Sequence, residues 1–154
     1  MNKRAFIIVL SGFLSLSVFS QMSFNSLYSN FSREENVEKV NLGGLLMLMA
    51  KPFVNKHTQG ASISSIKVLS LEDCTPEVKA RFNNQARLFR DKRYELFVNS
   101  NEKDDKTRIY LRFDKNMVRE MVIISMGDEP ALISLKGKIR PEDIEKWTEN
   151  TDDE

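Results

Sequence analysis

The chain has 154 residues, with 23 Lys and Arg against 22 Asp and Glu. This length suits one domain with one core, and the near-neutral charge gives no electrostatic reason to expect nucleic acid as a partner. One Cys excludes an intramolecular disulfide framework and a CxxC metal site. We expect this residue, Cys74, to be an inert and partly buried thiol, with a catalytic or dimer-forming thiol as the alternative.

The first twenty residues have the pattern of a secretory signal peptide. Lys3 and Arg4 form a positive start, and residues 5–19 form an apolar stretch. Val18 and Ser20 then occupy the −3 and −1 positions of a small-residue cleavage site. The apolar stretch is shorter than the roughly 20 residues that span a bilayer. We therefore predict export and cleavage after residue 20, and a retained membrane anchor is the competing interpretation.

Cleavage changes the size and charge of the chain. Removing 20 residues, with two basic side chains among them, leaves 134 residues with 21 Lys and Arg against 22 Asp and Glu. We expect residues 1–20 to be the signal peptide, residues 21–148 to form a single α+β domain, and residues 149–154 to form a disordered acidic tail. No stable transmembrane segment is expected after cleavage.

Short helices and strands alternate in the first half of the predicted domain. Periodic apolar side chains predict an amphipathic helix over residues 23–31. The nearly all-apolar residues 45–50 predict a buried helical turn or two, followed by a loop over residues 51–61. Residues 37–42 and the β-branched stretch 63–71 predict strands.

The clearest predicted element is a helix from residue 76 to about residue 92. Thr75 is a favourable N-cap, and Pro76 suits the first helical position because its missing N–H costs nothing there. Phe82 and Phe89 fall on one apolar stripe and predict packing against the body of the domain. The neighbouring stripe is basic: it could bind a phosphate, a glycan or an acidic partner, or simply face solvent. The candidate binding residues are Lys79, Arg87, Arg90 and Arg93.

Four strands with short connections are predicted next, over residues 94–100, 108–113, 117–126 and 132–136. The third is apolar on both faces in its second half and is typical of a central strand. A short helix should begin near Pro141. This order predicts an α+β fold with a mostly antiparallel mixed sheet and helices packed on one face, a two-layer sandwich.

The sequence offers little catalytic chemistry. His57, the only His, lies in a predicted loop without an identifiable nucleophile or orienting carboxylate, which favours a structural or exposed residue. Glu95 and Glu120 could act as an acid/base pair if they faced each other across strands. Alternatively, each could face solvent or pair with a cross-strand Arg such as Arg112 or Arg119. No metal-ligand spacing or cofactor motif is present, so neither a metal nor a cofactor is expected.

Several of these short segments, in their order along the chain, resemble the family called domain of unknown function 4252. The segments are Glu35-Asn36-Val37 with residues 45–49, residues 63–71, Tyr94-Glu95-Leu96, Glu120-Met121-Val122, and residues 135–139 with Asp143-Ile144. The similarity covers about residues 27–147. It implies a small exported protein of a Gram-negative bacterium, periplasmic or associated with the outer membrane, and it brings no activity.

The leading hypothesis is a non-catalytic cell-envelope protein that binds an unknown envelope protein or a small ligand through one face of the sandwich. The export signal and the missing nucleophile–base set motivate it. One alternative is an envelope hydrolase or transferase that uses Glu95, Glu120 or His57. Another is a sensor or regulator of envelope stress.

Overall fold

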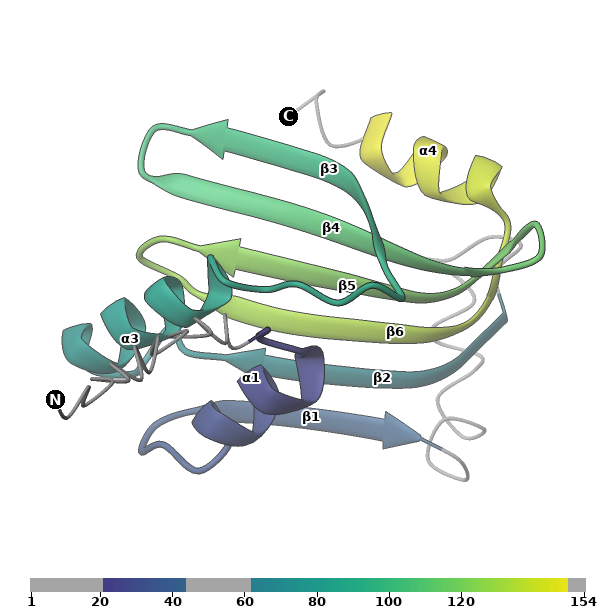
Figure 1. Cartoon of the computed structure of the whole chain (residues 1–154). Helices are drawn as coiled ribbons and strands as arrows, with labels where there is room; N and C mark the ends of the chain where they lie inside the picture. The colour runs from purple at the N-terminus through teal and green to yellow at the C-terminus, as the bar shows by residue number, and fades with distance from the viewer. Residues whose placement is uncertain (1–20, 44–61, 150–154) are drawn as a thin grey trace, which may run out of the picture.

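The computed structural model describes residues 21–43 and 62–149, which form a six-stranded sheet with three helices (Figure 1). The strands are β1 (Glu38–Gly43), β2 (Ser62–Ser70), β3 (Glu95–Glu102), β4 (Asp105–Asp114), β5 (Met117–Met126) and β6 (Ala131–Ile139). The helices are α1 (Phe24–Phe31), α3 (Pro76–Ala86) and α4 (Pro141–Glu149). The predicted signal peptide, the helical turn over residues 45–50, the loop with His57 and residues 150–154 lie outside the described residues.

The predicted α+β class is confirmed. The strands are arranged in the order β1-β2-β6-β5-β4-β3, and every neighbouring pair is antiparallel. Strands β3 to β6 form a meander of consecutive hairpins, and β2 then lies beside β6 although many residues separate them along the chain. The predicted central strand, residues 117–126, is β5 at its predicted bounds, and it lies between β4 and β6.

One face of the sheet, here called the helix face, is covered by α1 and α3 (Figure 1). Phe24, Leu27 and Phe31 form the buried side of α1, as the sequence predicts from their spacing. The rings of Phe31 and Phe82 meet edge to face with centroids 5.2 Å apart, which joins α1 to α3 above the sheet. The strands contribute buried side chains to the same cluster, namely Leu69, Tyr110, Val122, Ile124, Met126 and Leu132.

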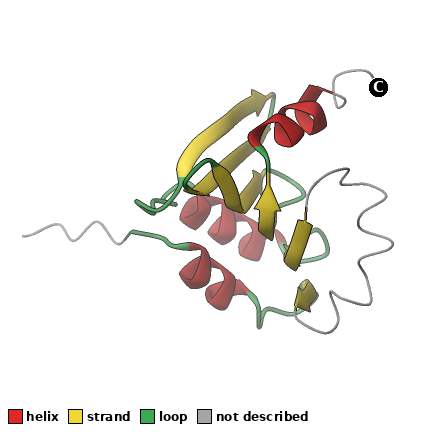
Figure 2. Ribbon diagram, turned by 90° about the vertical axis from the view of Figure 1, so that its right-hand side faces the viewer, coloured by secondary structure: helices red, strands yellow, loops and turns green. Residues whose placement is uncertain are grey.

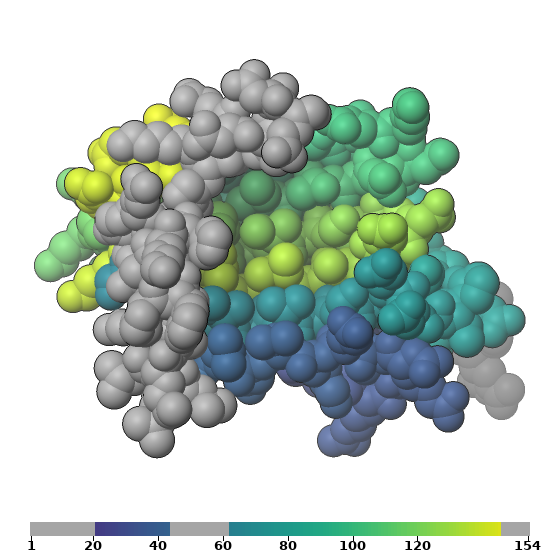
Figure 3. All heavy atoms as spheres, turned by 180° about the vertical axis from the view of Figure 1, so that it is seen from behind, coloured from purple at the N-terminus to yellow at the C-terminus, as the bar shows by residue number. Residues whose placement is uncertain are grey.

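The opposite face carries a second apolar cluster. Leu111, Met121 and Ile139 are buried there, and Ile144 of α4 packs among them. Helix α4 therefore belongs to this face and lies apart from α1 and α3 (Figure 2). Figure 3 turns this face toward the viewer and shows the strands side by side across it. The sheet has apolar side chains on both faces, so the sequence expectation of helices on one face describes only α1 and α3.

Helix α3 begins where the sequence predicts and ends earlier. The side chain of Thr75 accepts a hydrogen bond from the N–H of Val78, and Pro76 is the first helical residue. The helix ends at Ala86, and Arg87 is its C-cap, so the predicted extension to about residue 92 is wrong. The chain instead continues as a crossing segment, residues 87–94, which runs over the helix face to the start of β3 (Figure 1).

Contacts outside the helix explain why the crossing segment leaves it. Phe89 forms a parallel bridge with Met22, and the N–H of Arg90 donates to the carbonyl of Met22 at 3.1 Å. The Phe89 ring lies 4.7 Å from the Tyr110 ring, between centroids, and is buried. A turn at residues 87–88 thus lets Phe89 reach the sheet, and the N–H of Arg90 finds its partner in Met22.

Phe82 of the predicted apolar stripe and the exposed Leu88 give a stability prediction. Phe82 is fully buried between α1 and the sheet, so Phe82→Ala should lower the free energy of unfolding by about 3–5 kcal/mol. Leu88 is 57% exposed, and the matched change Leu88→Ala should alter it by less than about 0.5 kcal/mol. Urea denaturation of both variants measures the difference. Similar small losses in the two would contradict the position of α3 on the sheet.

Candidate functional site

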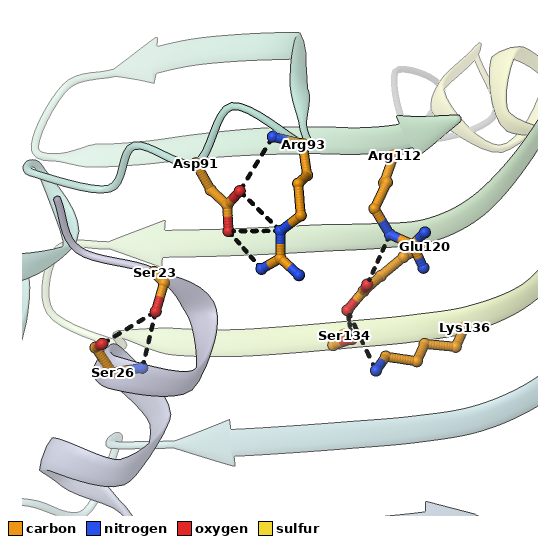
Figure 4. A network of polar contacts seen from close by, with 8 residues as sticks. All are labelled: Ser23, Ser26, Asp91, Arg93, Arg112, Glu120, Ser134 and Lys136. Atoms are coloured by element: carbon orange, nitrogen blue, oxygen red, sulfur yellow. Dashed lines mark hydrogen bonds and ion pairs between the residues drawn. The ribbon is translucent and has the colours of Figure 1, made fainter. Parts of the chain in front are cut away.

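Beyond α1 and α3, the helix face of the sheet is polar. Arg112 of β4 lies opposite Glu120 of β5, and Glu120 lies opposite Lys136 of β6. Ser134 shares this face with Lys136, two residues along the same strand. The four side chains therefore form a row across three neighbouring strands (Figure 4).

Glu120 is the centre of this row and is only 4% exposed. The Ser134 hydroxyl donates to its Oε1 at 2.9 Å, and the Arg112 Nε donates to its Oε2 at 3.3 Å. The Lys136 ammonium lies 3.9 Å from Oε1. A buried carboxylate is costly unless it is paired and hydrogen-bonded, and here both of its oxygens have partners.

The cations of the row remain accessible. The Arg112 side chain is 34% exposed and that of Lys136 is 48% exposed, although each contacts the buried carboxylate. Tyr94 lies at the same site, where burial and hydrogen bonding with Glu120 raise the pKa of its phenol well above the ordinary value. The phenol therefore stays protonated across the physiological range.

A second ion pair lies next to this row, on the crossing segment (Figure 4). The Arg93 guanidinium binds both carboxylate oxygens of Asp91, with Nε at 3.0 Å from Oδ1 and Nη2 at 2.6 Å from Oδ2. The Arg93 backbone N–H also donates to Oδ1 at 3.0 Å. Hydrogen bonding from Arg93 holds the pKa of Asp91 below its ordinary value.

The side chains of four different elements make this part of the helix face cationic. Lys67 of β2 lies opposite Ser134 in register and sits over the Tyr28 ring, with Nζ 5.5 Å from the centroid. Together with Arg93, Arg112 and Lys136 it forms what we call the cationic row. The two carboxylates within the row, Asp91 and Glu120, are each bound by its arginines. Two positive charges remain in excess.

A cleft of about 380 Å³ opens beside the cationic row, between the crossing segment and the edge of the sheet. Its lining residues come from the stretch before α1, the crossing segment, β3 and β4, and they are Gln21, Phe89, Arg90, Asp91, Lys92, Tyr94, Leu96 and Tyr110. A second hollow of about 320 Å³ lies at the start of α3, where Asn83 and Lys79 hold the turn after β5 through Gly127 and Asp128.

The basic residues predicted as one helix edge, with Arg93 just past it, do not share one edge in the structure. Lys79 is on α3, where its Nζ donates to the carbonyl of Asp128 at 2.8 Å, and Arg87 is the C-cap. Arg90 and Arg93 lie on the crossing segment, because the helix has already ended. Arg90 lines the cleft and Arg93 belongs to the cationic row.

Glu95 and Glu120 do not face each other. Glu95 lies opposite Leu111, on the face of the second cluster, whereas Glu120 shares the helix face with Val122. Of the alternatives open from sequence, the structure shows Glu120 paired with the cross-strand Arg112, and Glu95 is exposed. His57 lies outside the described residues. Burial raises the pKa of the Cys74 thiol, which supports an inert thiol.

Sequence reasoning missed Lys67, Lys136 and Tyr94 as site residues. Strand alternation places Ser134 and Lys136 on one face, and this signal was available in the sequence. The neighbourhood of β2 and β6, which brings Lys67 beside them, depends on a pairing between segments far apart in the chain.

The comparisons with known proteins give one result. The family model described as a domain of unknown function, DUF4252, matches residues 28–147. The chain belongs to this family. Comparison with curated proteins and with solved structures gave no match.

Two properties of the described residues bear on the site. In residues 21–43 and 62–149, no helix is long and apolar enough to cross a membrane. The same residues contain no group of three or more His, Cys, Asp or Glu side chains placed to hold a metal ion.

The contacts of Glu120 predict a stability difference between the two sequence-predicted carboxylates. Glu120→Gln should lower the free energy of unfolding by about 1–3 kcal/mol, because it removes charge-assisted hydrogen bonds from a buried site. The matched variant Glu95→Gln, on an exposed residue of the other face, should change it by less than about 0.5 kcal/mol. Urea denaturation tests both, and equal losses would remove Glu120 from its central role.

The Asp91–Arg93 pair predicts a pH dependence. Folding lowers the pKa of Asp91, so its pairing with Arg93 stabilises the fold at pH values above the pKa of an unfolded Asp, about 3.9. This stabilisation is lost as the pH falls through the lower pKa of the folded state. Asp91→Asn should therefore reduce stability at neutral pH, with a difference from wild type that shrinks below about pH 4. Denaturation at a series of pH values measures it. The control is Glu129→Gln, on an exposed turn, which should show no such convergence.

Proposed function

We propose that this chain is a non-catalytic exported protein of the cell envelope that binds an anionic ligand or partner through the helix face of its sheet. The observation that carries the proposal is the cationic row. Four basic side chains from β2, the crossing segment, β4 and β6 converge there, while the overall charge of the predicted mature chain is near zero. Such a local concentration of one sign attracts ligands of the other.

The details of the row favour binding over chemistry. Glu120 has both oxygens engaged, and Arg112 and Lys136 are held in place by it while they stay partly exposed. Arginine is suited to bind carboxylate or phosphate oxygens in pairs, and a side chain that is already positioned loses less freedom on binding. The row therefore has fixed donors for an anion.

The enzymatic alternative loses its paired-carboxylate form in this geometry. Glu95 and Glu120 lie on opposite faces of the sheet, so they cannot act on one bond together. The Glu120→Gln variant described above also tests a catalytic role of Glu120 alone. A variant that folds and loses a measured hydrolase or transferase activity would favour the enzyme over the binding protein.

The test is a binding titration followed residue by residue. Isotope-labelled protein is titrated with envelope lipids, cell-wall fragments and periplasmic extract, and amide shifts are recorded by two-dimensional NMR. We expect shifts that gather on β2, β4 and β6 around Lys67, Arg112 and Lys136, and that weaken as salt is added, because the contact is electrostatic.

A matched pair of variants separates the row from general charge. Lys67→Gln with Lys136→Gln removes two charges from the row and should weaken binding by roughly threefold or more. Arg33→Gln with Arg87→Gln removes two exposed charges outside the six strands and should leave binding unchanged. Absence of any shift with every envelope fraction, or equal loss in both pairs, would refute the proposal.

A further inference from the structure

The cleft beside the cationic row has an aromatic floor. Phe89 and Tyr110 are buried with ring centroids 4.7 Å apart, and the Tyr94 ring lies 6.1 Å from that of Phe89. Leu96 of β3 stands at the edge of the cleft and is 53% exposed. These groups offer apolar surface to a ligand.

The rim of the same cleft is cationic. Arg90 and Lys92 line it, and neither makes a side-chain hydrogen bond or ion pair with another part of the described chain. Asp91, between them, does not offset their charge, because Arg93 binds both of its carboxylate oxygens. Cleavage after residue 20, which the sequence predicts, would add the α-amino group of Gln21 to this rim.

The size of the cleft suits a small molecule. Its volume of about 380 Å³ lies within the range of roughly 300–1,000 Å³ that ligand sites in proteins occupy. A fully polar anion would leave the aromatic floor and Leu96 unused, and a neutral apolar compound would leave the two cations unused. A molecule with both parts uses both surfaces.

We propose that this cleft binds a small anionic amphiphile. A flat or short acyl body lies against Phe89, Tyr110 and Leu96, and a carboxylate or phosphate group meets Arg90 and Lys92. This inference rests on the proposed function, because it names the class of ligand that the same face would bind. The cleft is a site of its own, and binding at the cationic row does not depend on it.

Two probes with the same naphthyl body, one charged and one neutral, test the proposal. Naphthoate carries a flat apolar body and a carboxylate, and naphthalenemethanol carries the same body without charge. Each is titrated into the labelled purified protein up to millimolar concentration. We expect naphthoate to shift the amides of residues 89–96 and of Tyr110, and to bind roughly three- to tenfold more tightly than the alcohol.

Three variants assign the contacts. Arg90→Gln with Lys92→Gln should weaken naphthoate roughly three- to tenfold and leave the alcohol unchanged. Leu96→Ser should weaken both probes, because each loses apolar contact. Leu88→Ser, which changes an equally exposed leucine outside the cleft, should weaken neither.

The outcomes separate this inference from the proposed function. No naphthoate binding, equal affinity for the two probes, or shifts away from residues 89–96 and Tyr110 would overturn the cleft site. If envelope fractions still bound in a way that depended on Lys67 and Lys136, the proposed function would stand without it. If naphthoate bound as expected and every envelope fraction failed to bind, the cleft would stand and the wider proposal would fall.

Discussion

The constraint on which this structure depends is a sheet with apolar side chains on both faces. Neighbours in sequence are buried on opposite sides: Tyr110 belongs to the cluster under the helices and Leu111 to the cluster behind them. A polar side chain in such a strand must find partners within the fold. Glu120 meets this requirement through Arg112, Ser134 and Lys136, and in doing so it fixes two basic side chains at defined places on the helix face.

The crossing segment adds the second half of the site. By leaving the helical path after Ala86, the chain buries Phe89 against Tyr110 and pairs with Met22 near the start of the domain. The same change of direction brings Arg93 into the cationic row and sets Arg90 on the rim of the cleft. The cleft, the ion pair and the contact with Met22 therefore share one origin, which is the burial of a single aromatic ring outside the helix.

Much of the fold was predictable because its signals are local. Thr75 and Pro76 mark the start of α3 through hydrogen bonding and backbone geometry within one turn, and β5 is evident from its apolar run.

The end of α3 was missed because Phe89 keeps the helical spacing from Phe82, so no local signal opposes the helix. The cationic row was missed because the β2–β6 pairing that brings Lys67 to Ser134 spans distant segments. For Glu120 the sequence left Arg112 and Arg119 open, and the register of the β4–β5 hairpin selects Arg112.

The position of Glu120 also indicates what kind of chemistry this face supports. A general acid or base must exchange a proton with a substrate, which needs an oxygen free to approach it. Both oxygens of Glu120 are occupied by protein donors, and its side chain is almost completely buried. The side chains of Arg112 and Lys136, which contact it, are in contrast 34% and 48% exposed. The buried acid therefore holds two partly exposed cations in place, and this arrangement is what supports the proposal that the face binds an anion.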